Sequence, residues 1–238
     1  MIISAMDFDG KELNRRIKIA TEDVMVENCY GERFIGTGLK EKVVVIKGTP
    51  GNALGAYLDG GNIVVRGNAQ DAVGDTMNEG KIIVHGDAGD AVGYAMRGGE
   101  IFVKGNSGYR TGIHMKEYRN KKPVIVVGKE AGSFLGEYLA GGVIIVLGIG
   151  STKVPVGSFA GTGMHGGKIF VRSTKEIKDL PKQVIAKAAN EEDLREIIPY
   201  VTEFARHFGA DIKELIKGQY YVLSPNSSSP YKQLYVAN

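Results

Sequence analysis

The chain has 238 residues, of which 43% are hydrophobic and 24% charged, and its formal net charge at pH 7 is +3. These proportions are typical of a folded globular protein, and so small a net charge gives no reason to expect nucleic acid or a membrane surface as a partner. The single cysteine, Cys29, excludes an internal disulfide and favours a reducing compartment. The first residues lack the order of a signal peptide and no apolar run could span a bilayer, so we expect a cytoplasmic protein.

Residues 1–35 form a leading segment, which we interpret as a cap and in which residues 17–20 (IKIA) have the composition of a short strand. From residue 36 to residue 173 the chain repeats a unit of 19 residues, and many of its 34 glycines stand at fixed places in that unit. One column of glycines closes a β-branched run in each unit: Gly48, Gly67, Gly86 and Gly105. A second column keeps the same step and resumes after two insertions: Gly36, Gly55, Gly74, Gly93, Gly112, Gly136 and Gly161.

A unit of this length with one short β-branched run predicts a parallel β-helix. The stretches between the runs, such as residues 68–80, carry glycines in the middle and too few apolar residues for an amphipathic helix. Each strand must still bury an apolar face, which it can do by stacking on its counterpart one turn later. We therefore expect an all-β fold, a right-handed parallel β-helix of about seven turns over residues 36–173.

Counting back from the closing glycine assigns the side chains of each strand to the inside or the outside. The second and fourth residues before it, such as Ile46 and Val44, are Val or Ile and should line the core. The residue just before it should face outward: Lys47, Arg66, His85, Lys104, Val127, Leu147 and Arg172. The third residue before it should also face outward, yet it is always apolar: Val45, Val64, Ile83, Phe102, Ile125, Ile145 and Phe170. Such a stripe needs a cover, either the chain's own helix 191–208 or a partner subunit.

Residues 174–238 predict an α-helical extension and a tail. Asp179, followed by Leu180 and Pro181, has the pattern of a helix start. A second helix is expected over residues 191–208, with Asn190 as its N-cap, Gly209 as its C-cap and a kink at Pro199. A short helix over residues 211–217 and an aromatic, turn-rich tail complete the chain.

No residue stands out as a catalytic group, a cofactor ligand or a metal ligand. Residues 161–166 (GTGMHG) match a dinucleotide fingerprint, but a strand follows them where that motif needs a helix. The polar columns Asn68, Asp87, Asn106 and Asn52, Asp71, Asp90 recur at the repeat period, which favours a ladder of turn residues over a calcium or catalytic site. The four histidines, His85, His114, His165 and His207, have no metal-ligand spacing. The charged insertion at residues 116–122 is interpreted as a solvated loop, although insertions in solenoids also serve as binding loops.

The repeats resemble those of a known family. Residues 48–61, 67–80 and 86–99 (GTPGNALGAYLDGG, GNAQDAVGDTMNEG and GDAGDAVGYAMRGG) are similar to the glycine-rich turns of the carboxy-terminal domain of glutamate synthase, as are residues 131–148. The run 191–218 and the following QYYVLSP resemble the end of that enzyme's large subunit. A subunit of formylmethanofuran dehydrogenase shares the same repeats and the same coil.

In both families the β-helix is a structural component, so the resemblance implies a scaffold subunit without activity of its own. We expect a stand-alone subunit of a multi-chain glutamate synthase, docked on a flavin-dependent synthase subunit and a glutaminase subunit that carry the FMN and iron–sulfur groups. The first alternative is the corresponding subunit of a formylmethanofuran dehydrogenase-like complex, and the second is a β-helix protein acting on carbohydrate. Self-association of the chain stays open.

Overall fold

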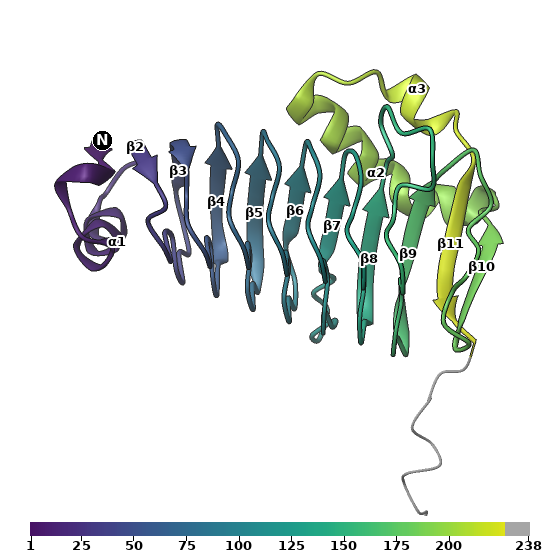
Figure 1. Cartoon of the computed structure of the whole chain (residues 1–238). Helices are drawn as coiled ribbons and strands as arrows, with labels where there is room; N and C mark the ends of the chain where they lie inside the picture. The colour runs from purple at the N-terminus through teal and green to yellow at the C-terminus, as the bar shows by residue number, and fades with distance from the viewer. Residues whose placement is uncertain (227–238) are drawn as a thin grey trace, which may run out of the picture.

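The computed structural model describes residues 1–226 and shows a β-solenoid whose strands form one sheet (Figure 1). The strands β1 to β9 stack in chain order and in parallel, and β11 and β10 add to the last of them in antiparallel fashion. The bounds are β1 (Ile2–Ser4), β2 (Val24–Tyr30), β3 (Val43–Thr49), β4 (Asp59–Val65), β5 (Glu79–Val84), β6 (Glu100–Val103), β7 (Val124–Val127), β8 (Ala140–Val146), β9 (Gly166–Arg172), β10 (Val184–Ala188) and β11 (Tyr220–Pro225). The predicted all-β parallel β-helix is confirmed.

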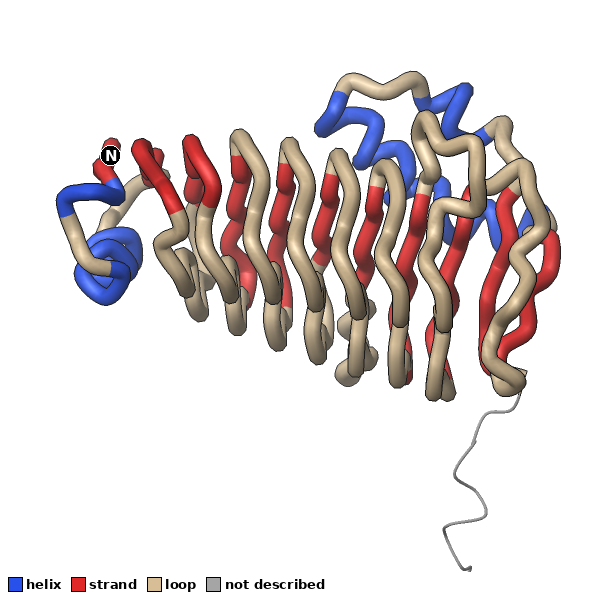
Figure 2. The backbone as a smooth tube through the Cα atoms, in the orientation of Figure 1, coloured by secondary structure: helices blue, strands red, loops and turns tan. Residues whose placement is uncertain are grey.

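Each turn of the solenoid consists of one strand and a longer stretch of loop that returns to the next strand (Figure 2). The strands pair in register, so the same columns of the repeat lie above one another. One inward column holds Val44, Ile63, Ile82, Ile101, Ile125, Ile144 and Ile169, and all of these are completely buried. Because β2 pairs with β3, the stack includes one turn more than the seven predicted from the sequence.

The glycine column at the middle of each turn makes room for this inward column. Gly55 has a φ of +65°, and a Cβ placed on it would lie 2.6 Å from Cδ1 of Ile82 on the next turn. Gly136 has a φ of +64° and would meet Cδ1 of Ile169 at 2.6 Å in the same way. The left-handed backbone and the close approach both require glycine. The core of the solenoid is therefore a stack of isoleucines, each seated against the glycine of the preceding turn.

The predicted side-chain directions are wrong at one strand, β7. Ile125 pairs with Ile101 and Val127 with Val103, so both point into the core, whereas the sequence placed them outside. The reason is that glycine and lysine have exchanged places after this strand, with no residue lost: the amide of Lys129 donates to the carbonyl of Gly105, as the amide of Gly105 donates to that of Gly86 one turn earlier. The amide of Gly128 donates to the carbonyl of Val103, as the amide of Lys104 donates to that of Val84 one turn earlier, so Gly128 takes the place of the lysine. Counting back from this glycine therefore shifts the assignment by one residue, which exchanges the two faces of a strand.

The N-terminal end of the stack carries β1, a 3-10 turn η1 (Ala5–Asp7) and the helix α1 (Gly10–Ile19). The prediction of a strand at residues 17–20 is wrong, because Ile17 lies in α1. The Asp9 side chain caps this helix by accepting a hydrogen bond from the amide of Glu12. Leu13 and Ile17, four residues apart, face the core together and are buried, so the helical period outweighs the β-branched composition.

The C-terminal end of the core is closed by β10 and β11, while the helices α2 (Glu191–Phe208) and α3 (Ile212–Ile216) lie on the outer face of the strands. The prediction of a helix start at Asp179 is wrong, since the chain there runs without a helix into β10. Val184 of β10 fills the space against Gly161. Val184 thus takes the place of the isoleucine that a further turn would have supplied. The helix at 191–208 is confirmed, with a capping box between Asn190 and Asp193 at its start. The part of the predicted tail beyond residue 226 lies outside the described residues.

Candidate interaction surface

The apolar stripe on the outer face of the strands is covered by the chain itself. Phe102, Ile145 and Phe170 are completely buried on this face. They form a second apolar cluster with α2, which contributes Ile197, Val201 and Phe204, and with residues of α3 and β11. Only the first turns, at Val45 and Val64, stay half-exposed. Of the two covers considered from the sequence, the helix accounts for the stripe from β5 onward.

The glycine that follows β7 at the place of Lys104 serves this packing. A Cβ added to Gly128 would lie 2.7 Å from Cζ of Phe204, so the ring of the helix occupies the volume of a side chain that the strand lacks. Charged side chains flank the apolar contact. The ammonium groups of Lys122 and Lys168 lie 2.6 and 2.7 Å from the carboxylate of Glu196 on α2. Burial alone raises the pKa of Glu196, but its hydrogen bonds with the two lysines outweigh this and hold the pKa below its ordinary value.

The two polar columns form hydrogen-bond ladders. Oδ1 of Asp87 accepts from the amide of Asn106 on the next turn at 2.7 Å, and Oδ1 of Asp71 accepts from the amide of Asp90 at 2.9 Å. The interpretation of these residues as a turn ladder is confirmed. In residues 1–226, no three acidic, histidine or cysteine side chains are grouped so that they could hold a metal ion.

Gly161 and Met164 of the dinucleotide-like stretch occupy ordinary positions of the repeat, and Met164 is completely buried in the core. His85 lies in an outward column, where its Nε2 is 2.8 Å from the Arg66 guanidinium. Burial first, and then the nearby Arg66 and Lys104 charges, lower the pKa of His85. Burial raises the pKa of the Cys29 thiol to about 12, which makes it a weak nucleophile at neutral pH.

The surface that the sequence did not reveal is a row of rings on the glycine-rich side of the solenoid. We call it the aromatic edge, and it consists of Tyr94, Arg110, His114, Phe134, Tyr138 and Phe159. The rings of His114 and Tyr138 are stacked with their centroids 5.1 Å apart, and those of Phe134 and Phe159 are stacked at the same distance. Most of these side chains are exposed, with 41% of Tyr94 and 55% of Phe159 open to solvent.

The backbone beneath the aromatic edge explains why these positions are unusual. Each turn places three residues in the left-handed region at alternate positions, for example Ala53, Gly55 and Tyr57 with φ of +62°, +65° and +56°. The outer two positions of this triplet hold glycine or alanine in several turns, but in others they hold large side chains, as at Phe34 and Tyr57 in the first two turns. The aromatic edge uses five of these positions, Arg110, His114, Phe134, Tyr138 and Phe159, with φ between +53° and +63°.

Large residues at these positions are costly. A left-handed conformation costs a residue with a side chain roughly 1–2 kcal/mol, and one stacked aromatic pair returns roughly 0.5–1.5 kcal/mol. Stacking within the chain therefore offsets only part of the strain of Phe134 and Phe159, which together form one pair. Exposed aromatic residues and arginine are also the side chains most enriched where proteins bind one another. The aromatic edge thus has the chemistry of a docking surface.

Comparisons with known proteins agree with this architecture. The sequence model of the GXGXG motif family matches residues 6–226. The uncharacterized protein MJ1350 of Methanocaldococcus jannaschii is 42% identical to this chain in an alignment of 250 positions, which covers 99% of this chain and 96% of that protein. Among solved structures, a chain of the formyltransferase/hydrolase complex FhcABCD from Methylorubrum extorquens, crystallised with methylofuran, has a similar fold. The match covers 85% of this chain and 72% of that one, with a TM-score of 0.64 and 21% sequence identity.

The described helices include none that is both long enough and apolar enough to cross a membrane.

Proposed function

The chain belongs to the GXGXG motif family, and from this premise we propose that it is a structural subunit of a formylmethanofuran dehydrogenase-like or formyltransferase/hydrolase complex. The aromatic edge carries the proposal, because it is an exposed surface of rings maintained at the cost of backbone strain. The fold match to a chain of the FhcABCD complex supports the choice of this class of complex. The catalytic groups, cofactors and metals of the reaction are assigned to the partner chains.

The physical role of such a subunit is to hold partners at fixed positions. Successive strands of a sheet lie about 4.8 Å apart, and the inward columns leave each turn fully packed against the next. Because α2 is fixed on the outer strand face by Phe204 and by the ion pairs of Glu196, that face is not offered to a partner from β5 onward. The glycine-rich side, where Tyr138 and Phe159 are exposed, presents the docking surface.

A second candidate is the corresponding subunit of a glutamate synthase. It is supported by the similarity of residues 48–99 to the repeats of that enzyme and by the resemblance of residues 191–218 to the end of its large subunit. The partners would then be a flavin-dependent synthase chain and a glutaminase chain. Both candidates use the same surface and differ only in what binds to it.

The test is isolation of the tagged chain from its own cells under native conditions, followed by mass spectrometry. Recovery of molybdopterin- or tungstopterin-dependent chains, or of a formyltransferase, supports the first candidate. Flavin-dependent glutamate synthase chains select the second. Recovery of the chain alone at low and at high salt contradicts a subunit role.

Substitutions locate the surface. In the variant Tyr138→Ala/Phe159→Ala we expect the partners to be lost while the fold is kept, since alanine stands at equivalent left-handed positions in other turns. Tyr57→Ala is the matched control, because Tyr57 has the same backbone conformation and is 54% exposed but lies outside the stacked rows. Equal loss of partners in both variants would contradict docking at the aromatic edge.

A further inference from the structure

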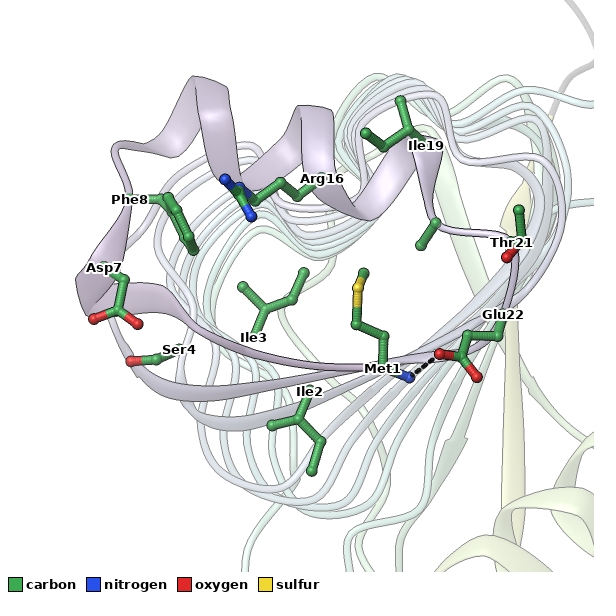
Figure 3. A pocket seen from close by; sticks show the side chains of 11 residues that line it. Met1, Ile2, Ile3, Ser4, Asp7, Phe8, Arg16, Ile19, Thr21 and Glu22 are labelled. Carbon is green, nitrogen blue, oxygen red and sulfur yellow. Dashed lines mark ion pairs between the residues drawn. The ribbon is translucent and has the colours of Figure 1, made fainter.

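Charged side chains at several places on the solenoid are paired with an opposite charge. At the N-terminal end, beside the hollow between β1 and α1, the ammonium of Met1 lies 3.1 Å from the Glu22 carboxylate (Figure 3). Next to the outer strand face, the ammonium of Lys47 lies 2.8 Å from the Glu27 carboxylate. One row beyond it has only basic side chains. We call it the basic row, and it consists of Arg66, His85 and Lys104, which directly follow β4, β5 and β6.

The centre of the basic row is a neutral histidine. Nε2 of His85 lies 2.8 Å from a guanidinium nitrogen of Arg66. A guanidinium has only donors, so Nε2 accepts this hydrogen bond and the ring carries its one proton on Nδ1. A protonated imidazole has no acceptor, and it would turn an N–H group towards the guanidinium. Protonation of His85 therefore breaks the hydrogen bond and sets two like charges against each other.

His85 also supports the last residue of α2. Its ring meets the ring of Phe208 at an interplanar angle of 84°, with the centroids 5.2 Å apart. Phe208 in turn lies edge-on against Phe204, one helical turn earlier, at 4.7 Å. The helix ends here, because Gly209 is its C-cap. A movement of the His85 ring thus removes a support of the last turn of α2 and leaves the contacts of the middle of the helix in place.

The charged groups around His85 decide the direction of the effect. Burial first, and then the positive charges of Arg66, Lys104 and His207, lower the pKa of His85 below its ordinary value of 6.5. Among residues 1–226 no carboxylate offsets these charges at His85. The stabilising contribution of the neutral ring is therefore complete above pH 6.5 and is lost as the pH falls through the lowered value.

We propose that His85 is a pH-sensitive latch for the C-terminal end of α2. At neutral pH the imidazole accepts a hydrogen bond from Arg66 and packs against Phe208. When it is protonated, its ring turns away from the guanidinium, Phe208 loses its support, and the last turn of the helix separates from the strands. The outer side of β5 and β6 then joins the half-exposed stripe at Val45 and Val64, so that acidification enlarges the open apolar surface.

His207, on the same end of α2, acts in the opposite direction. Its Nε2 lies 3.3 Å from the Glu203 carboxylate, so its protonation creates an ion pair within the helix. Burial raises the pKa of Glu203, but its contacts with Lys81 and His207 outweigh this and hold the pKa below its ordinary value of 4.5. The carboxylate thus stays charged while the histidines titrate, and loosening of the helix end on acidification is assigned to His85 alone.

The inference is independent of the proposed function, since it involves neither the aromatic edge nor a partner chain. The test is a histidine NMR titration and amide exchange on the full chain between pH 7.5 and pH 5. The Cε1–H signal that is absent from His85→Gln gives the pKa of His85, and exchange corrected for its intrinsic rate gives the protection of residues 203–208.

In the wild type this protection should fall as His85 is protonated, by about tenfold for each pH unit that separates the measured pKa from 6.5. The amides of β8, beneath the rest of the helix, should keep their protection. A pKa of His85 at or above 6.5, or equal protection of residues 203–208 at the two pH values, would overturn the inference.

Variants identify the group that titrates. His85→Gln keeps an acceptor for Arg66 and cannot be protonated, so the protection of residues 203–208 should be the same at pH 7.5 and pH 5. His207→Gln is the matched control, because it removes the neighbouring histidine, and it should retain the loss of protection on acidification. A pH dependence that persists in His85→Gln, or that disappears in His207→Gln, would assign the switch to another group and overturn the inference.

Discussion

Replacing Gly55 with alanine should destabilise the solenoid by more than the strain of its backbone alone. Gly55 has a φ of +65°, and the new Cβ would lie 2.6 Å from Cδ1 of Ile82 and 3.2 Å from Cδ1 of Ile63. The left-handed conformation costs alanine roughly 1–2 kcal/mol, and the smaller entropy of its unfolded chain returns roughly 0.4–1 kcal/mol. Overpacking of a filled core adds roughly 1–3 kcal/mol. We therefore expect Gly55→Ala to lower the free energy of unfolding by about 2–4 kcal/mol.

Gly38 is the matched control for this substitution. Its φ is +63°, and no atom lies within 4 Å of the position that a Cβ would take. Gly38→Ala therefore carries the conformational cost without the overlap, and it should lower the free energy of unfolding by about 1 kcal/mol or less. Urea denaturation followed by far-ultraviolet circular dichroism measures both variants, since linear extrapolation of the free energy to zero urea gives its value in water.

A double-mutant cycle separates overlap from every other cause. Ile82→Val removes the Cδ1 atom that the new side chain would strike, at a cost of its own of about 0.5–1.5 kcal/mol. The double variant Gly55→Ala/Ile82→Val should therefore lose less stability than the two single variants lose in total, and the difference should be about 1 kcal/mol. Equal losses for Gly55→Ala and Gly38→Ala, or no coupling with Ile82→Val, would refute the idea that each isoleucine is seated against a glycine.

The other predictions concern the cover of the outer strand face. Glu196→Gln should destabilise the fold by roughly 1 kcal/mol, because two partly exposed ion pairs, with Lys122 and Lys168, are lost together; equal stability of the variant and the wild type in urea would contradict this. The folded-state pKa of Glu196 is lowered, so its stabilising contribution is complete above the ordinary value near 4.5 and disappears as the pH falls through the lowered value. Urea titrations from pH 6 to pH 3 should show this loss in the wild type and a weaker one in Glu196→Gln. Gly128→Ala should displace Phe204 and speed amide exchange in α2 by at least tenfold, while β3 and β4 keep their protection. An exchange rate in α2 that is the same in the variant and in the wild type would contradict the role of this glycine.

The repeat predicted the fold because a stacked solenoid imposes the same demands on every turn. A position that must hold a β-branched residue in one turn must hold one in the next, as at Ile63 and Ile82, and this produces a periodicity visible in the sequence alone. The same regularity caused the error at β7. After this strand the glycine stands one residue before its usual column, at Gly128, and the lysine follows it at Lys129. Counting back from the glycine alone does not reveal this exchange.

The ends were harder to predict than the repeat because they are built once. Ile17 is β-branched and favours a strand locally, but the Asp9 cap and the four-residue spacing to Leu13 select a helix when the end of the core must be covered. Val184 was assigned to a helical region because Pro181 precedes it at helix-start spacing. It forms a strand because β11 offers it a partner and the last glycine of the column leaves a space for it.

The aromatic edge escaped prediction for a different reason. Its residues lie two positions before or after the glycine column, and nothing in the sequence indicates that these positions share the left-handed conformation of the glycine. Once the structure shows this, the substitution of Phe159 or Tyr138 for the glycine or alanine of other turns becomes informative. The spacing of the three left-handed residues, at every second position, is also the spacing that the name of the GXGXG motif family describes.

The interior of the solenoid limits where any function of this chain can lie. In each described turn from Gly36 to Gly136, the space beside the glycine is filled by an isoleucine of the following turn, so the repeat leaves no room for a ligand between its two sides. The outer strand face is closed from β5 onward by α2, and its side chains are fixed there by Phe204. What varies freely between turns is the pair of positions flanking the glycine, which point outward and tolerate any residue that can bear the strain. Rings at these positions, such as Tyr138 and Phe159, offer a partner a large contact area for each strained residue.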